Sequence, residues 1–245
     1  MRRPRSIGRL ALLLWLLASP AAAQDLVADL SQRRIDISTG FSGAEVLVFG
    51  AIEGGGDVVV VARGPSQDLV VRRKERHFGI WINGTEARFD SAPGFYAVAS
   101  SRPLADILPE QERRRGRVGA DLLPLVPRGG GANPEEFRAA MIELRDQQGL
   151  FSENDPPASI VGGKLFSARI AFPATVVTGQ YRIEALLVRD GRIMVARDLS
   201  LTVRRVGLGA DLWRIAHDMP LLYGMASLLI AALAGWLGSV LFRRN

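Results

Sequence analysis

The feature that most constrains this chain is an uncharged, apolar segment of 23 residues near the C-terminus, from Pro220 to Phe242. As an α-helix rising 1.5 Å per residue, it would measure about 35 Å and cross a hydrocarbon core of about 30 Å. A helix that is apolar on every side is buried in a large core or spans a membrane. The segment predicts a transmembrane helix at 220–242, with Tyr223 and Trp236 as interfacial residues.

The first 23 residues have the three parts of a secretory signal peptide. Four arginines precede a short apolar run from Leu10 to Leu17, and three alanines end at Ala23. We expect export by the general secretory route and cleavage between Ala23 and Gln24. The apolar run is too short for a comfortable membrane span, and an uncleaved anchor is the alternative.

The last residues set the expected orientation. Arg243 and Arg244 directly follow the apolar segment, and basic residues favour the cytoplasmic side of a membrane. Together with the signal peptide, they predict a single-pass protein of the inner (cytoplasmic) membrane. Its body, residues 24–206, would lie in the periplasm and residues 243–245 in the cytoplasm. Residues 207–219 read as an amphipathic juxtamembrane helix at the membrane surface, or alternatively as a helix packed on the exported body.

The net charge of +6 gives no reason to expect a nucleic-acid partner. Its excess comes from four arginines before residue 10 and two after residue 242, and the remaining chain is neutral. A run at 113–117 contains four arginines and could contact anionic headgroups. Acidic neighbours offset it, so we interpret it as a solvated face.

The residue inventory disfavours enzymatic chemistry. The chain has no cysteine and only two histidines, His77 and His217. It therefore has no disulfide, thiol nucleophile or cysteine-ligated metal, and His77 follows a charged run typical of a surface strand. The glycine runs at 54–56 and 129–131 lack the Lys-Ser/Thr pair of a phosphate loop and predict turns. We expect no catalytic, cofactor-binding or metal-binding residue, and no cofactor.

Between the two ends, the chain reads mainly as short strands separated by glycine, proline and asparagine turns. Alternating or continuous apolar runs predict strands at 34–38, 44–52, 58–62, 69–76, 78–82, 95–99, 168–172, 181–189 and 192–203. Asn83-Gly84 and Asp190-Gly191 predict two-residue hairpin turns. These features favour an antiparallel, immunoglobulin-like sandwich, in which Tyr181 can close a tyrosine corner.

A largely helical insertion is expected at about 103–157. Its clearest helix runs from Pro134 to Gln148, with Asn133 as its N-cap and Gly149 at its end. Helical spacing predicts that Phe137, Met141 and Leu144 form the buried stripe of this helix.

Small residues recur every four positions along the predicted membrane span: Ser227, Ala231, Gly235 and Ser239. Such a face lets a second helix approach closely in lipid. We predict that this helix packs against a partner, either a second copy of the chain or a transporter. A plain membrane anchor is the alternative.

The whole plan resembles the uncharacterised alphaproteobacterial transmembrane protein family. The resemblance covers nearly the whole chain and is carried by the signal segment and by three runs: GFSGAEVLVFGAI, FPATVVTGQYRIEALLVRDG and LLYGMASLLIAALAGWLGSVLF. It implies no established activity. It also implies an accessory role in transport, because members look like genomic neighbours of sulfite-exporter-type anion permeases.

The expected function is a non-enzymatic, membrane-anchored periplasmic accessory or interaction module for a membrane partner such as an anion transporter. The alternative is a periplasmic ligand-binding or sensor domain. That alternative would need another protein for signalling, since only three residues follow the predicted span.

Overall fold

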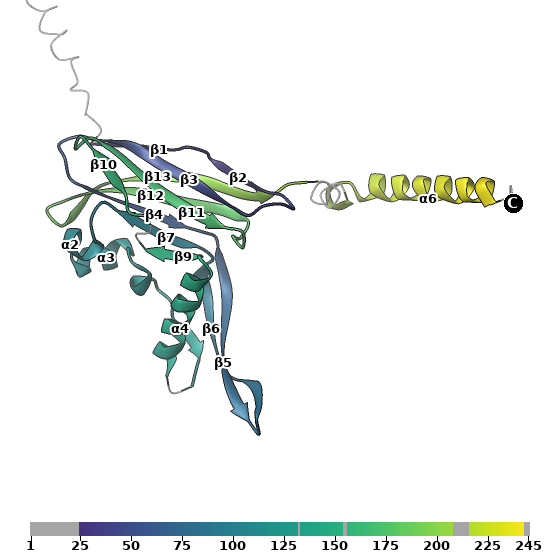
Figure 1. The fold of residues 1–245 in the computed structure, drawn as a ribbon, viewed down its shortest axis with the longest axis horizontal. Coiled ribbons are helices and arrows are strands. Elements are labelled where there is room, and N and C mark those ends of the chain that lie inside the picture. The colour runs from purple at the N-terminus through teal and green to yellow at the C-terminus, as the bar shows by residue number, and fades with distance from the viewer. Residues whose placement is uncertain (1–24, 132, 154–155, 208–215, 243–245) are drawn as a thin grey trace, which may run out of the picture.

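The computed structural model describes residues 25–131, 133–153, 156–207 and 216–242. Ala23 and Gln24, most of the predicted juxtamembrane helix, and Arg243 with Arg244 lie outside these residues. The described chain is mainly β, with several sheets and one C-terminal apolar helix (Figure 1). This confirms the predicted fold class at that level, whereas the immunoglobulin-like detail is not confirmed.

Two sheets make up the body. The first has the order β1-β3-β11-β10 and is entirely antiparallel. Its strands are β1 (Leu26–Leu30), β3 (Gly43–Ile52), β10 (Ser159–Val161) and β11 (Leu165–Pro173). The second has the order β2-β13-β12-β4-β7-β9, in which each outermost strand is parallel to its neighbour. Its strands are β2 (Arg34–Ile37), β4 (Asp57–Arg63), β7 (Tyr96–Ser100), β9 (Phe151–Glu153), β12 (Gly179–Arg189) and β13 (Arg192–Arg205).

Side chains from both sheets belong to one buried apolar cluster. Strand β11 alternates buried and more exposed residues, as expected for a strand with one face on a core. Strand β4 is instead buried throughout its centre, Val58–Ala62, as in a strand covered on both faces. Three rings join the two sheets: Phe172 of β11 stacks on Phe95 with centroids 4.7 Å apart, and Tyr181 of β12 lies edge-on to both.

Tyr181 also fixes the turn before its own strand. Its hydroxyl donates a hydrogen bond of 2.6 Å to the carbonyl oxygen of Val177, four residues upstream. This is the local contact that the sequence predicted for a tyrosine corner. Burial raises the pKa of the Tyr181 phenol to about 12.

A third, three-stranded sheet projects from the body (Figure 1). It consists of β5 (Ser66–His77), β6 (Ile80–Pro93) and β8 (Pro127–Gly129), in the order β5-β6-β8. We call the hairpin of β5 and β6 the arm, and its residues 77–82 the arm tip. The base of the arm joins the core through Phe89 and Ala92, which are buried.

The turn of this hairpin corrects the sequence prediction. Asn83-Gly84 does not form the turn; these residues lie within β6, where Asn83 pairs with Lys74. The chain reverses at Phe78-Gly79, both with positive φ. The second predicted hairpin is correct: Asp190-Gly191 joins β12 to β13, and the residues on either side of it pair with each other.

The segment between β7 and β10 contains helices, as expected, but also two strands that join other sheets. Its helices are α2 (Leu104–Ile107), α3 (Glu110–Gly116), the 3-10 turn η1 (Ala120–Leu122) and α4 (Pro134–Gln147). Phe137 and Met141 of α4 are buried, whereas Leu144 is exposed, so the predicted stripe ends one turn early. Asn133 occupies the N-cap position, but its side chain makes no capping hydrogen bond.

Candidate interaction surfaces

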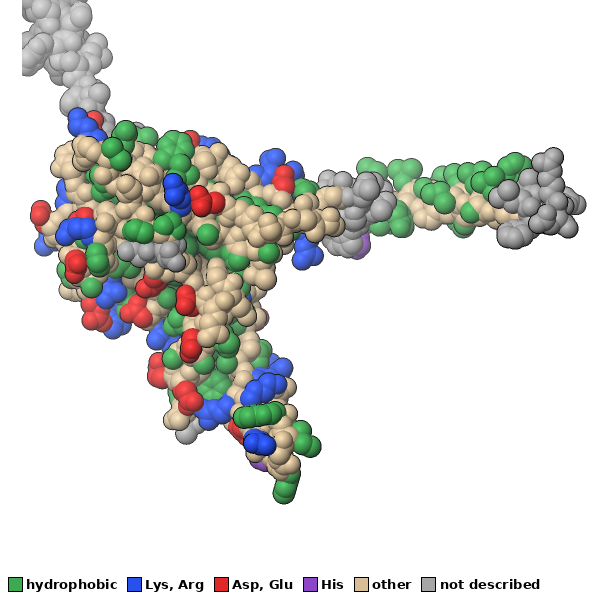
Figure 2. All heavy atoms as spheres, in the orientation of Figure 1, with side chains coloured by type: hydrophobic (Ala, Val, Ile, Leu, Met, Phe, Trp, Pro, Cys, Tyr) green, Lys and Arg blue, Asp and Glu red, His purple; other side chains and the backbone are tan. Residues whose placement is uncertain are grey.

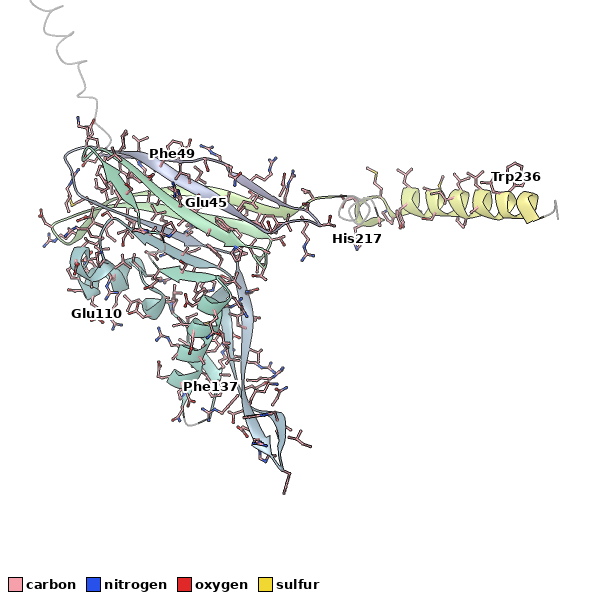
Figure 3. All side chains as sticks on the ribbon, in the orientation of Figure 1. Glu45, Phe49, Glu110, Phe137, His217 and Trp236 are labelled. Carbon is pink, nitrogen blue, oxygen red and sulfur yellow. The ribbon has the colours of Figure 1, made fainter. Side chains whose placement is uncertain are left out.

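The C-terminal helix α6 (Pro220–Phe242) is the first candidate surface. It is the one helix in the described chain that is long and apolar enough to cross a membrane, over Pro220–Ser239, and none of that window is buried. Figure 2 shows hydrophobic side chains along its length, and Trp236 projects from it in Figure 3. Since the apolar surface of Pro220–Ser239 is not covered by any described part of the body, it is open to lipid or to another helix.

The predicted small-residue face lies within α6. Ser227, Ala231, Gly235 and Ser239 are all solvent-exposed in the isolated chain. The Ser227 hydroxyl donates to the carbonyl oxygen of Tyr223 within the helix, at 2.8 Å, so its polar group is already satisfied there. A Cβ atom built on Gly235 would meet nothing within 4 Å. The space beside Gly235 is therefore open to a partner.

The arm tip is a second exposed surface, and sequence reasoning missed it. Phe78, Ile80, Trp81 and Ile82 are 106 %, 68 %, 65 % and 44 % exposed, respectively. Figure 2 shows hydrophobic and basic side chains together at the far end of the arm. The signal for it in the sequence is the apolar stretch FGIWI directly after a basic run, whose local pattern predicts only a strand.

Helix α4 supports the arm between the tip and the base. The Arg73 guanidinium lies 2.5 Å from the Glu136 carboxylate and 5.3 Å from the centre of the Phe137 ring, which Figure 3 labels on α4. His77 lies at the end of β5, half-exposed, with its Nε2 atom 3.5 Å from Glu75. It is the surface histidine of a charged strand that the sequence predicted. His217 lies just before α6, far along the chain from His77 (Figure 3).

The arginine run of α3 is largely neutralised. Arg114 pairs with Glu110 and Arg115 pairs with Glu112, one turn away on the same helix. Arg113 lies 4.0 Å from Asp121. These are the acidic neighbours on which the prediction of a solvated face rested, and this region presents little net charge to an anionic partner.

A polar network joins α3 to the second sheet. Arg63 of β4 forms an ion pair with Glu184 of β12 and donates to the backbone carbonyls of Gly116 and Arg117, both at 3.0 Å. The Tyr96 hydroxyl accepts a 2.7 Å hydrogen bond from the Gly119 amide. Burial raises the pKa of the Tyr96 phenol above its ordinary value, so it stays neutral. Because Arg63, Glu184 and the Tyr96 hydroxyl all have partners within the chain, we assign the network to structure.

A shallow groove of about 650 Å³ lies between α4, η1 and β9. Its ionisable lining is mostly acidic: Asp121, Glu135, Glu143, Asp146 and Glu153, against Arg138. Part of this charge is used locally, because Glu153 accepts a hydrogen bond from the Ala120 amide and Arg138 lies 3.7 Å from Glu135. In the described part of the chain, no group of three or more His, Cys, Asp or Glu residues could hold a metal ion.

Comparison with known proteins identifies one family. A family model described as Putative transmembrane protein (Alph_Pro_TM) matches residues 25–244. A comparison with curated proteins gives no match. The matched region includes both sheets of the body, the arm and α6.

Proposed function

The chain belongs to the Alph_Pro_TM family of alphaproteobacterial transmembrane proteins, as its sequence led us to expect, and we propose that it is a membrane-anchored interaction module and not an enzyme. The observation that carries this proposal is α6, an uncharged helix that is unburied over Pro220–Ser239 and bears small residues at every fourth position from Ser227 to Ser239. The inventory of two histidines and no cysteine supports a non-enzymatic role.

The chemistry of helix association in lipid explains why the small face matters. Apolar side chains gain nothing by leaving lipid tails, so van der Waals packing and weak polar contacts must drive association. Small residues at 227, 231, 235 and 239 let two helix backbones come close enough for such packing. A helix that served only as an anchor would not need this face.

We further propose that the protein lies in the inner membrane with its body in the periplasm. The signal-peptide organisation before Gln24 and the two terminal arginines support this orientation. Intact mass of the membrane-extracted protein should place the N-terminus at Gln24. Protease added to spheroplasts should digest the body and leave a small membrane-embedded fragment. Retention of residues 1–23, or full protection of the body in sealed spheroplasts, would contradict this assignment.

The proposed partner of α6 is another membrane helix, from a second copy of the chain or from an anion transporter. The chain has no native cysteine, so Ala232→Cys can carry a photoreactive cross-linker at the border of the small face, outside its row of small residues, without competing sites. In native membranes we expect defined cross-linked products, identified by mass spectrometry. Gly235→Ile adds bulk at the contact and should reduce them several-fold, whereas Leu229→Ile, which keeps the side-chain volume, should not. Equal products from both variants would assign α6 to anchoring alone.

The acidic groove beside α4 supports a second candidate function, binding of a cationic small molecule in the periplasm. Native mass spectrometry of the full chain, released from membranes in mild detergent, tests it directly. A retained small molecule that Glu143→Gln removes would favour this function over helix association.

A further inference from the structure

The arm tip presents apolar side chains in several directions at once. Residues paired across two strands share a face of the hairpin, and successive residues alternate between faces. Ile80 pairs with His77 and Ile82 with Glu75 on one face, while Trp81 pairs with Arg76 on the other. Phe78 lies in the turn itself and is fully exposed. A protein-binding patch usually lies on one side of a molecule and has a polar rim. An apolar end that is exposed on all sides instead suits insertion into a lipid layer.

The turn that carries Phe78 is energetically unfavourable for that residue. Phe78 has φ of 49°, in the left-handed region where a bulky side chain is an outlier. The β12–β13 hairpin supplies an internal comparison, because its turn is almost the same, with φ of 49° at Asp190 and 73° at Gly191. There the first position holds aspartate, a residue that tolerates this geometry. Since the exposed Phe78 ring gains no packing within the chain, its presence points to a contact outside the chain.

Basic side chains line the face of the arm that holds Trp81. The pairing places Val70, Arg72, Lys74 and Arg76 on one face with their partners on β6. Towards the tip, that face carries Arg72, Lys74, Arg76 and Arg88 with Glu86, whereas Asp68 and Asp90 lie nearer the base of the arm. Glu86 lies 3.0 Å from both Arg72 and Arg88, further from the tip, so Lys74 and Arg76 keep positive charge beside Trp81. Basic residues next to Trp and Phe are typical of segments that bind anionic membrane surfaces.

The arm can reach the membrane that α6 spans. Fourteen residues, 206–219, join the end of β13 to the start of α6, and because 216–218 are helical this link reaches at most about 42 Å. The twelve residues of β5 measure about 40 Å at the rise of a strand. The link and the arm are thus of similar length, and the link keeps the arm within a few nanometres of the bilayer. It also holds the body beside the membrane at high effective concentration.

We propose that the arm tip inserts into the headgroup layer of the membrane in which α6 is anchored, and that it prefers anionic phospholipids. Phe78 and Trp81 lie at headgroup level, and Lys74 and Arg76 contact the phosphates. This contact would fix the body at a set height and orientation above the bilayer. The inference goes beyond the proposed function and requires only that α6 spans the membrane, on whichever side the body lies.

The fluorescence of Trp81 tests the proposal in the full chain. The other three tryptophans are replaced by phenylalanine, and the protein is reconstituted at one chain per phosphatidylcholine nanodisc, with or without phosphatidylglycerol. A small share of the lipid carries a nitroxide near its headgroup as a quencher. We expect strong quenching and a blue-shifted emission of Trp81 in discs with phosphatidylglycerol, and less of both in discs without it. Since one basic residue at an anionic surface is worth about 1 kcal/mol, Arg76→Gln should lower the ratio of inserted to free arm roughly fivefold.

Phe78→Asn separates insertion from folding. Asparagine suits the left-handed turn, so this variant should unfold at the same or a higher temperature, yet lose most of the quenching. A matched control places the reporter at Val161, which is 64 % exposed at the turn between β10 and β11. In a Trp81→Phe chain, Val161→Trp should stay unquenched.

Unquenched Trp81 in both lipid mixtures would overturn the proposal. So would quenching that is equal at Trp81 and at the Val161→Trp control, because it would show no preference for the tip. A blue shift without quenching, which grows when several chains share a disc, would assign the tip to a second copy of the chain. None of these readouts involves a partner of α6, so they are independent of the test of the proposed function.

Discussion

The ring of Phe172 offers the sharpest test of how the two body sheets pack. Phe172 is only 1 % exposed and contacts Phe95 and Tyr181, so it lies between the sheets. Phe49, labelled in Figure 3, is in the same sheet but is 43 % exposed. Phe172→Ala should cost about 3–5 kcal/mol of unfolding free energy, because it leaves a cavity in the core. Phe49→Ala should cost about 1 kcal/mol, because its ring already contacts solvent.

The assay is thermal unfolding of the full chain in detergent, followed by circular dichroism at the strand band. For a body of this size, each kcal/mol lowers the midpoint by about 2–4 °C. Phe172→Ala should therefore unfold about 6–20 °C below the wild type, and Phe49→Ala only a few degrees below it. Midpoints for the two variants within about 3 °C of each other would refute the argument that Phe172 fills a core shared by both sheets.

A double-mutant cycle covers the case in which Phe172→Ala fails to fold. Phe172→Leu and Tyr181→Leu each keep an apolar side chain but remove the edge-on ring contact between β11 and β12. Aromatic pairs of this kind couple by about 0.5–1.5 kcal/mol. Additive losses would mean that the two rings, and so the two sheets at this point, do not depend on each other.

Two further predictions concern the body. Gly50→Ala should lower the unfolding free energy by about 3 kcal/mol in the same assay, because a Cβ atom at Gly50 would lie 1.9 Å from the Val27 carbonyl oxygen. Gly40→Ala is the control: it has open space around it and should change the unfolding free energy by less than about 0.5 kcal/mol. Asp57 accepts hydrogen bonds from the Arg102 guanidinium, which hold the pKa of its carboxyl below the ordinary value. The stability that the ionised Asp57 contributes is thus complete above its ordinary pKa near 4, and it is lost as the pH falls through the lower pKa of the folded state. Asp57→Asn should accordingly flatten the acid side of the stability–pH curve, and an unchanged acid side would contradict the assigned ion pair.

The sequence predicted the mainly β body and the apolar C-terminal helix because both depend on local periodicity. The hairpin turn of the arm shows where local signals fail. A turn at Asn83-Gly84 would pair Phe78 with Phe89 and leave β5 facing β7, which already pairs with β4. The observed turn at Phe78-Gly79 instead pairs Leu69 with Phe89 and Val71 with Ala87 on the supported face of the arm. Long-range pairing thus outweighs the better local turn.

The candidate surfaces were predicted unevenly for a related reason. The small-residue face of α6 follows from helical spacing alone, so its four residues could be named from the sequence. Exposure of the arm tip depends on how far β5 and β6 extend beyond the body. That length depends on which other elements pack against the two strands, and local sequence does not specify it. Leu144 shows the same limit. Helical spacing predicts the apolar stripe of α4, but it does not predict how much of that stripe the rest of the protein buries.

The edges of the three sheets narrow down how the protein can associate. Unpaired strand edges invite pairing with another chain, and short or charged edges resist it. Among the described strands, the edges of the two body sheets are at most five residues long: β1, β2, β9 and β10. The longest outermost strand is β5, with twelve residues, and its outer half carries Arg72, Arg73, Lys74 and Arg76. A second copy that paired along β5 would place these positive charges next to those of its own β5, and the like charges would repel each other. Strand addition is therefore disfavoured at these outermost strands, and α6 and the arm tip remain the surfaces proposed to contact a helix and a lipid layer, respectively.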